Sequence, residues 1–197
     1  MTKQQKYPSS LTDEQIEFIK QFLPVSSNFG RPPLEMAQVL NAIFYVVVGG
    51  VAWRMLPKDF PQWKSVYHYF WKWRRSGDWA RIYNALRQLE RLRQGREAEA
   101  SAGSLDSQSV KNVGGKQESR GYDAGKKITG RKRHLLVDTI GLPIALKVTA
   151  ASASDQAGAR SLFAENKGKL KNLKKVWVDG TRSRSGMARR SQTRIRH

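Results

Sequence analysis

Two aspartates stand where carboxylates could carry out chemistry. Asp106 interrupts an apolar stretch, directly after Leu105, and Asp179 directly follows the apolar run Val176–Val178. An acid on a buried strand is costly unless a cation or a hydrogen-bond donor meets it. If the two strands are neighbours, the carboxylates converge, and paired carboxylates provide the oxygen ligands that Mg²⁺ or Mn²⁺ prefers. Asp106 and Asp179 are therefore predicted as metal ligands and as catalytic residues.

Two such ions could activate a water or a 3′-hydroxyl and stabilise the leaving oxygen in an in-line phosphoryl displacement. A single aspartate at a strand end is more often a turn or cap residue, so the prediction depends on the pair. Asp138, which precedes Thr139–Gly141, suits the start of a β-turn, and Asp155 suits the first turn of a helix. The lone His134 could be a ligand or a base, and the sequence favours neither role.

The charge of the chain points to a polyanionic partner. Thirty-six Lys and Arg residues face 16 Asp and Glu residues, which gives a formal net charge of +20. DNA, RNA and anionic membranes are the candidates for such a field. A solvated basic surface is the alternative, but ordinary solubility does not need so large an imbalance.

The densest basic stretch before the last residues of the chain runs from Lys126 to His134 and leads into a predicted strand. As a phosphate clamp it would hold DNA beside the acids, and the alternative is a solvated loop. We favour DNA contact, and the residues predicted to make it are Lys126, Lys127, Arg131, Lys132 and Arg133.

Cysteine is absent, which excludes disulfides and thiolate metal sites. The longest apolar stretch, Ala42–Val48, is far shorter than the roughly 20 residues of a membrane span. The N-terminus lacks the basic-then-apolar pattern of a signal peptide. We therefore expect a cytoplasmic, nucleoid-associated protein with no membrane partner.

Residues 1–94 predict a helical domain. Thr12 and Gln15 form a capping box at the start of the first helix, and Gly49 ends the second. Five of the six Trp residues lie between Trp53 and Trp79, which favours a small core built from large side chains. The fourth helix is predicted to bury the following residues: Trp79, Ile82, Tyr83, Leu86 and Leu89.

The third predicted helix, which begins near Trp63, carries a set of polar and basic residues. They are Lys64, His68, Lys72, Arg74 and Arg75. A helix-turn-helix-like unit with such a third helix could enter the major groove of DNA. A helical bundle with a basic face is the alternative.

Residues 95–103 predict a linker, and a second domain follows over 104–180. Its pattern is a strand through Asp106, a hairpin over 134–149, a helix capped by Ser154 and a last strand ending at Asp179. A helical crossover would place the last strand parallel to the first. The expected fold is α+β, with a helical domain followed by the first part of an RNase H-like α/β domain.

Several motifs now agree in order and spacing. They are Trp53–Pro57 with Phe60, Pro61 and Trp63; Leu105–Lys111; Gly121–Lys127; Gly130–His134; Val137–Thr139; and Val178–Gly180. With these motifs the chain resembles the IS5-type (IS4/IS5-like) DDE transposases of bacterial insertion sequences. The resemblance extends from about Tyr7 to Gly180.

The resemblance implies an RNase H-like catalytic domain with a DDE triad and two Mg²⁺ (or Mn²⁺) ions. It implies double-stranded DNA as partner, with cleavage at terminal inverted repeats and strand transfer into target DNA, and self-association into a multimer. Asp106 and Asp179 match the first two acids of the triad.

Residues 181–197 do not continue the pattern. The stretch contains no Asp or Glu and almost no large apolar residue, so neither the third acid of the triad nor a further strand is expected there. The abrupt change predicts a basic, disordered, frame-shifted tail, and so a C-terminally truncated transposase. A decayed element copy and a programmed frameshift both remain open.

The resulting expectation is a transposase by family that is inactive as this polypeptide, with a marginally stable catalytic half. The alternative is a non-catalytic DNA-binding fragment that regulates or inhibits full-length transposase. A basic RNA-binding protein, such as a ribosomal one, is a third possibility. The clustered Trp residues and the acids on apolar strands argue against it.

Overall fold

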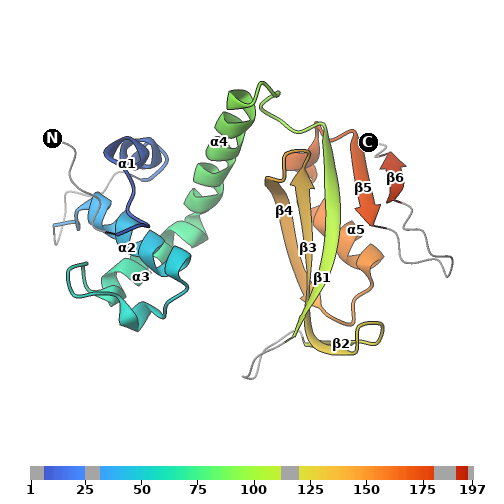
Figure 1. Ribbon diagram of the computed structural model, residues 1–197, viewed down its shortest axis with the longest axis horizontal. Helices are drawn as coiled ribbons and strands as arrows, with labels where there is room; N and C mark the ends of the chain where they lie inside the picture. Colours follow the sequence, from blue (N-terminus) through green and yellow to red (C-terminus); the bar gives the residue numbers. More distant parts are fainter. Residues whose placement is uncertain (1–6, 25–31, 112–119, 180–189, 195–197) are drawn as a thin grey trace. The chain divides into compact units, whose positions relative to one another are not determined.

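The computed structural model describes residues 7–24, 32–111, 120–179 and 190–194. Contacts along the chain divide it into two compact units, residues 1–90 and 91–197. The chain is thus a mixed α+β protein, with helices in the first unit and a mixed sheet in the second, as the sequence predicts (Figure 1).

The helical unit contains α1 (Asp13–Lys20), α2 (Met36–Gly49), the 3₁₀ turn η1 (Trp53–Met55), α3 (Trp63–Ser76) and most of α4 (Asp78–Arg93). The predicted capping box at α1 is confirmed. The Thr12 hydroxyl accepts from the Gln15 backbone N–H at 3.2 Å, and the Gln15 side chain accepts from the Thr12 N–H at 2.9 Å. Gly50 and Gly77, both with positive φ, end α2 and α3.

The core of this unit is apolar and aromatic. Val39, Leu40 and Ile43 of α2 meet Val66 and Trp73 of α3, all of them buried. The Trp73 ring makes an edge-on contact with Trp79, with ring centroids 5.4 Å apart. The predicted core role of the Trp residues is therefore confirmed for Trp73, whereas Trp71 is exposed.

The predicted burial of α4 was wrong after Ile82. Ile82 is buried and Trp79 packs against the helical core, but Tyr83, Leu86 and Leu89 are exposed. Only the first turns of α4 contact this core, so the later apolar side chains of α4 lack its cover.

The second unit is built on one sheet with strands β1 (Ala102–Lys111), β2 (Gly121–Asp123), β3 (Ile128–Asp138), β4 (Pro143–Ala150), β5 (Lys175–Asp179) and β6 (Arg190–Arg194). The strands run in the order β2-β3-β1-β5-β6, and β4 also pairs with β3. The predicted hairpin of β3 and β4 is confirmed, as is the parallel pairing of β1 with β5. Between β4 and β5 lie α5 (Asp155–Glu165) and the 3₁₀ turn η2 (Lys167–Leu170).

Two strand predictions were wrong. β3 begins at Ile128 rather than at His134, because Gly130–Arg133 of the basic stretch pair with Gln108–Lys111, the second half of β1. A strand, β6, also lies within the last 17 residues and pairs antiparallel with β5, although its sequence is polar. The remainder of the predicted tail, 181–189 and 195–197, lies outside the described residues.

Side chains alternate between the two faces of this sheet. We call the face that packs against α5 the covered face, and the opposite one the open face (Figure 1). Leu105, Leu136 and Val176 lie on the covered face and form a core with Leu162 of α5 and Leu173. The strand positions between them face the other way, which decides where each candidate residue lies.

Candidate functional site

Asp106 lies in the middle of β1 on the open face, and its side chain is exposed. Its register partner in β3 is Leu135. On the other side of β1, the parallel register pairs Leu105 with Val178 of β5. The next residue along each strand is an aspartate, Asp106 in β1 and Asp179 in β5.

The backbone register therefore brings the two predicted acids to adjoining positions at one end of β5. The Asp179 side chain lies outside the described part of the chain, so convergence of the two carboxylates stays a prediction. Among the residues that the structure describes, no group of three or more His, Cys, Asp and Glu side chains could hold a metal ion.

Strand alternation divides the predicted basic clamp into two sets. Arg131 and Arg133 pair with Val110 and Gln108, so they share the open face with Asp106. The Arg133 guanidinium donates a hydrogen bond of 2.6 Å to the Gln108 side chain. These two arginines thus lie on the face where DNA would have to lie if Asp106 acts on it.

Lys126 and Lys127 lie in the turn before β3, and both are exposed. Lys126 donates to the Ser107 carbonyl at 3.3 Å, so it leans against the strand that carries Asp106. Lys127 has a φ of 53°, an unusual value for a lysine that belongs to the tight turn.

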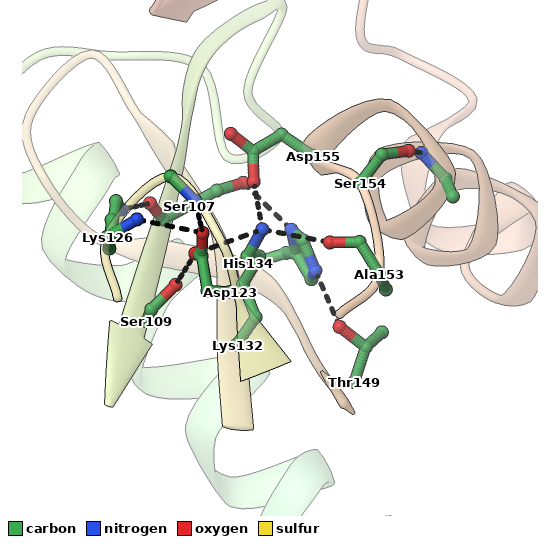
Figure 2. A network of polar contacts seen from close by, with 12 residues as sticks. Ser107, Ser109, Asp123, Lys126, Lys132, His134, Thr149, Ala153, Ser154 and Asp155 are labelled. Atoms are coloured by element: carbon green, nitrogen blue, oxygen red, sulfur yellow. Dashed lines mark hydrogen bonds and ion pairs between the residues drawn. The ribbon is translucent and has the colours of Figure 1, made fainter. Parts of the chain in front are cut away.

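Lys132 lies on the covered face, with its side chain 8% exposed (Figure 2). The Lys132 ammonium donates to the Ala153 carbonyl at 2.8 Å, and it lies 3.0 Å from the Asp155 carboxylate and 3.5 Å from the Asp123 carboxylate. A buried ammonium with three protein partners does not face a DNA phosphate. We therefore remove Lys132 from the predicted DNA-contact set.

His134 is completely buried on the same face. Its Nδ1 lies 2.8 Å from the Ser107 hydroxyl and its Nε2 lies 3.0 Å from the Thr149 hydroxyl (Figure 2). Burial lowers the pKa of His134 below its usual value, the Asp155 carboxylate opposes this, and the Lys132 charge adds to it. The contacts favour a neutral imidazole that ties β3 to β1 and β4.

Asp123 is a charged partner that the sequence analysis missed. The Ser109 hydroxyl donates to it at 2.5 Å and the backbone N–H groups of Gly125 and Lys126 donate at 3.1 Å. Led by the Ser109 hydrogen bond, these contacts lower the pKa of Asp123 to about 2. The Asp-x-Gly sequence, which suits a turn closed by an aspartate side chain, could have signalled it.

Asp138 closes a turn, as predicted. One carboxylate oxygen accepts from the N–H groups of Ile140 and Leu142, at 3.0 and 2.9 Å. The other accepts from the Arg91 guanidinium at 2.6 Å, and both side chains of this ion pair are buried. The pairing with Arg91, which also donates to the Glu97 carbonyl at 2.8 Å, was not predicted.

The predicted DNA-contact residues of the helical unit all lie on α3 and are all exposed. They are Lys64, His68, Lys72, Arg74 and Arg75. Lys64, His68, Lys72 and Arg75 follow one another at spacings of four, four and three residues, which places them along one side of the helix. The Arg75 guanidinium lies 4.7 Å from the centre of the Trp71 ring.

Two family models match the chain. One, described as "Putative transposase of IS4/5 family", matches residues 11–83, and the other, described as "Transposase DDE domain", matches residues 97–188. Together they support an IS4/5-type DDE transposase. The first match falls on the helical unit that carries the basic face of α3. The second match covers Asp106 and Asp179, together with the paired residues Leu105 and Val178 that precede them.

No curated protein and no solved structure matches the chain. The two family matches point to transposition as the function and to DNA as the partner, and DDE transposase domains generally use divalent metal ions. Within the part of the chain that the structure describes, no helix is both long and apolar enough to cross a membrane.

Proposed function

We propose that the second unit is an RNase H-like catalytic domain of an IS5-type transposase that cuts and joins DNA at terminal inverted repeats. In this proposal Asp106 and Asp179 are two of the three carboxylates of the active site. The observation that carries it is the parallel register of β1 and β5, in which the residue after the Leu105–Val178 pair is an aspartate on both strands.

The proposed donors suit Mg²⁺ or Mn²⁺, because both are carboxylates and Asp106 is exposed on an open sheet face. Two bound ions would polarise the scissile phosphate and activate the attacking oxygen. The contribution of the chain is to hold its two acids at fixed neighbouring positions. Main-chain pairing of β1 with both β3 and β5 supports that rigidity.

DNA contact is assigned to two surfaces. On the sheet unit it consists of Lys126, Lys127, Arg131 and Arg133, which lie in the turn before β3 or on the open face. On the helical unit it is the exposed basic side of α3, which we propose acts in a helix-turn-helix-like way. Both surfaces offer Lys and Arg side chains to phosphates, so binding is expected to weaken steeply with salt.

The third carboxylate is the open part of this proposal. Residues 180–197 contain no Asp or Glu. We propose that cutting needs a third carboxylate besides Asp106 and Asp179, and we expect the chain to self-associate. A second candidate function is that of a non-catalytic DNA-binding protein that inhibits a catalytically active transposase, and the exposed basic side of α3 supports it.

Measurement of Mn²⁺ binding by water-proton relaxation tests the site directly. Loss of an outer-shell partner of a metal ligand typically costs about tenfold or more in metal affinity, and loss of a ligand itself should cost at least as much. Asp106→Asn and Asp179→Asn should therefore each weaken Mn²⁺ binding by about tenfold or more. Glu17→Gln, at an exposed acid of α1, is the matched control and should have no effect. Unchanged binding in both aspartate variants would show that the metal site is elsewhere.

Nicking of DNA that carries an element end, in Mg²⁺ or Mn²⁺, tests activity. Salt-dependent binding is expected for a transposase and for the non-catalytic alternative, and nicking separates the two. Nicking that disappears in Asp106→Asn would support the assigned site and rule out the non-catalytic alternative. Nicking that persists in Asp106→Asn would contradict the assignment of Asp106.

A further inference from the structure

Helix α3 exposes two large aromatic rings that its core does not need. Tyr67 and Trp71 lie one turn apart, and each is 42% exposed. The inner side of the same helix is already filled, because Val66 and Trp73 are buried in the core. Single exposed aromatic residues are common, whereas neighbouring exposed rings on one helix face form a patch of the kind that binds a partner.

Cations surround these two rings. Lys64, His68, Lys72 and Arg75 lie within one turn of Tyr67 or Trp71 and are all exposed. The sequence of α3, WKSVYHYFWKWRRS, contains no acid at all. We call this set, Lys64, Tyr67, His68, Trp71, Lys72 and Arg75, the aromatic–basic face of α3.

Each ring has one aromatic or cationic neighbour that leaves part of the ring exposed. Tyr67 makes an edge-on contact with Trp53 of η1, with ring centroids 5.3 Å apart. The Arg75 guanidinium lies over the Trp71 ring. The remaining exposed ring surface is available to a flat partner, and the contact with Trp53 restricts the Tyr67 ring before binding, which lowers the entropy cost of stacking.

The chemistry of this face selects among possible partners. Intact duplex DNA would engage the cations through its phosphates, but its bases are already stacked on each other and offer the rings no face. Unpaired nucleotides offer both a phosphate backbone and open base faces. Surfaces that bind single strands combine these two features, a basic track and aromatic stacking platforms.

We propose that the aromatic–basic face of α3 binds unpaired nucleotides of DNA, with Trp71 and Tyr67 stacking on bases and Lys64, Lys72 and Arg75 contacting phosphates. The inference rests on the proposed function and deepens it. The DNA bound by the helical unit would then be a duplex with a melted or single-stranded segment beside it, rather than uninterrupted duplex.

Fluorescence anisotropy with two labelled DNAs tests this inference, one a blunt duplex and the other the same duplex with a short single-stranded tail. The full chain should bind the tailed DNA about tenfold more tightly, which is the gain expected from one or two stacked bases. Trp71→Ala should abolish this preference, so that the variant binds the tailed and the blunt DNA with equal affinity. Trp71→Phe keeps a ring and should retain most of the preference.

Two controls separate stacking from charge and from folding. Tyr122→Ala removes an exposed aromatic of the sheet unit and should leave the preference intact. Lys72→Ala should weaken binding to both DNAs by a similar factor, because it removes a phosphate contact. Thermal melting by circular dichroism identifies any variant that fails to fold, and Trp71→Phe then carries the test.

The outcomes distinguish this inference from the proposed function. Equal affinity of the wild-type chain for both DNAs overturns the stacking inference and leaves DNA binding intact. A preference that survives in Trp71→Ala also overturns it. Absence of binding to either DNA at low salt would overturn the proposed function as well.

Discussion

The two units of this molecule are stabilised by different kinds of interaction. In the helical unit, the buried contacts are mainly apolar and aromatic, with Trp73 and Leu40 at the centre, although Asp78 and Arg87 are also buried there. In the sheet unit, an apolar core on the covered face is joined by buried charges, namely the Arg91–Asp138 ion pair and the Lys132 network. The difference affects both stability and function.

One lesson concerns the net charge. On α3 every Lys and Arg is exposed, whereas Arg91 and Lys132 of the sheet unit are buried and form ion pairs within that unit. These ion pairs leave the formal net charge of +20 unchanged, but they reduce the number of cations that the sheet unit can offer to DNA. A second lesson concerns stability. When one partner of a buried ion pair is removed, the other charge stays buried without compensation, which strongly destabilises the folded state.

The largest effect is expected at the Arg91–Asp138 pair. Arg91→Met leaves the Asp138 carboxylate buried without its cation, which should destabilise the sheet unit by about 3–5 kcal/mol. Hydrogen exchange measured by mass spectrometry can follow the two units separately. Arg93→Met, at an exposed position of the same turn, is the matched control. Similar effects of the two substitutions would contradict the assigned role of the buried pair.

Lys132 and Arg133 sharpen the comparison between the two faces of the sheet. Lys132→Met should cost about 2 kcal/mol of stability, because one of its carboxylate partners is half-exposed and can be hydrated. It should not alter DNA affinity under conditions where the unit stays folded. Arg133→Met should do the reverse, lowering DNA affinity several-fold with little effect on unfolding. Equal losses of DNA affinity in filter binding would contradict the division into faces.

The pH dependence of stability should also differ between the units. Because the folded pKa of His134 is depressed, its stabilising contribution is complete above the ordinary value of 6.5 and is lost as pH falls through the lower folded value. Denaturant unfolding, monitored by hydrogen exchange, should show that the stability of the sheet unit decreases as the pH falls below 6.5 towards the folded pKa of His134. His134→Asn should remove this dependence, and His68→Asn, at an exposed histidine, should leave it unchanged.

The smallest effects are expected at two matched helix caps. Thr12 caps α1 in the helical unit and Ser154 caps α5 in the sheet unit. Replacing either residue with Ala should cost about 1 kcal/mol. Each loss should appear only in the unit that carries the cap, as urea unfolding with hydrogen-exchange detection can show. The exchange of Thr12 for Ser keeps the hydroxyl and should be nearly neutral.

Local signals in the sequence predicted much of this structure. The capping box at Thr12, the turn at Asp138 and the hairpin that follows depend on residues close in sequence, and all are confirmed. The parallel pairing of β1 and β5 followed from the handedness of a helical crossover.

The rest depended on contacts that the sequence pattern does not carry. Arg91 and Asp138 are 47 residues apart, and nothing local marks them as partners. Lys132 was predicted to contact DNA together with the rest of the basic stretch, and only its position in β3 shows that it faces inward. β6 has no apolar residue to signal a strand. The role of Asp106 and Asp179 stays a prediction.

The basic segment of β3 has a consequence for mutation. Arg131 and Arg133 lie on the open face, and Lys132 and His134 lie on the covered face. The face on which a side chain of this segment lies therefore depends on whether its position is odd or even. Deleting one residue between Gly130 and Arg133 would exchange the two sets, putting a guanidinium where the ammonium of Lys132 meets Asp155. An insertion or deletion of a single codon in this segment should thus be more damaging than the substitution of any one of its residues.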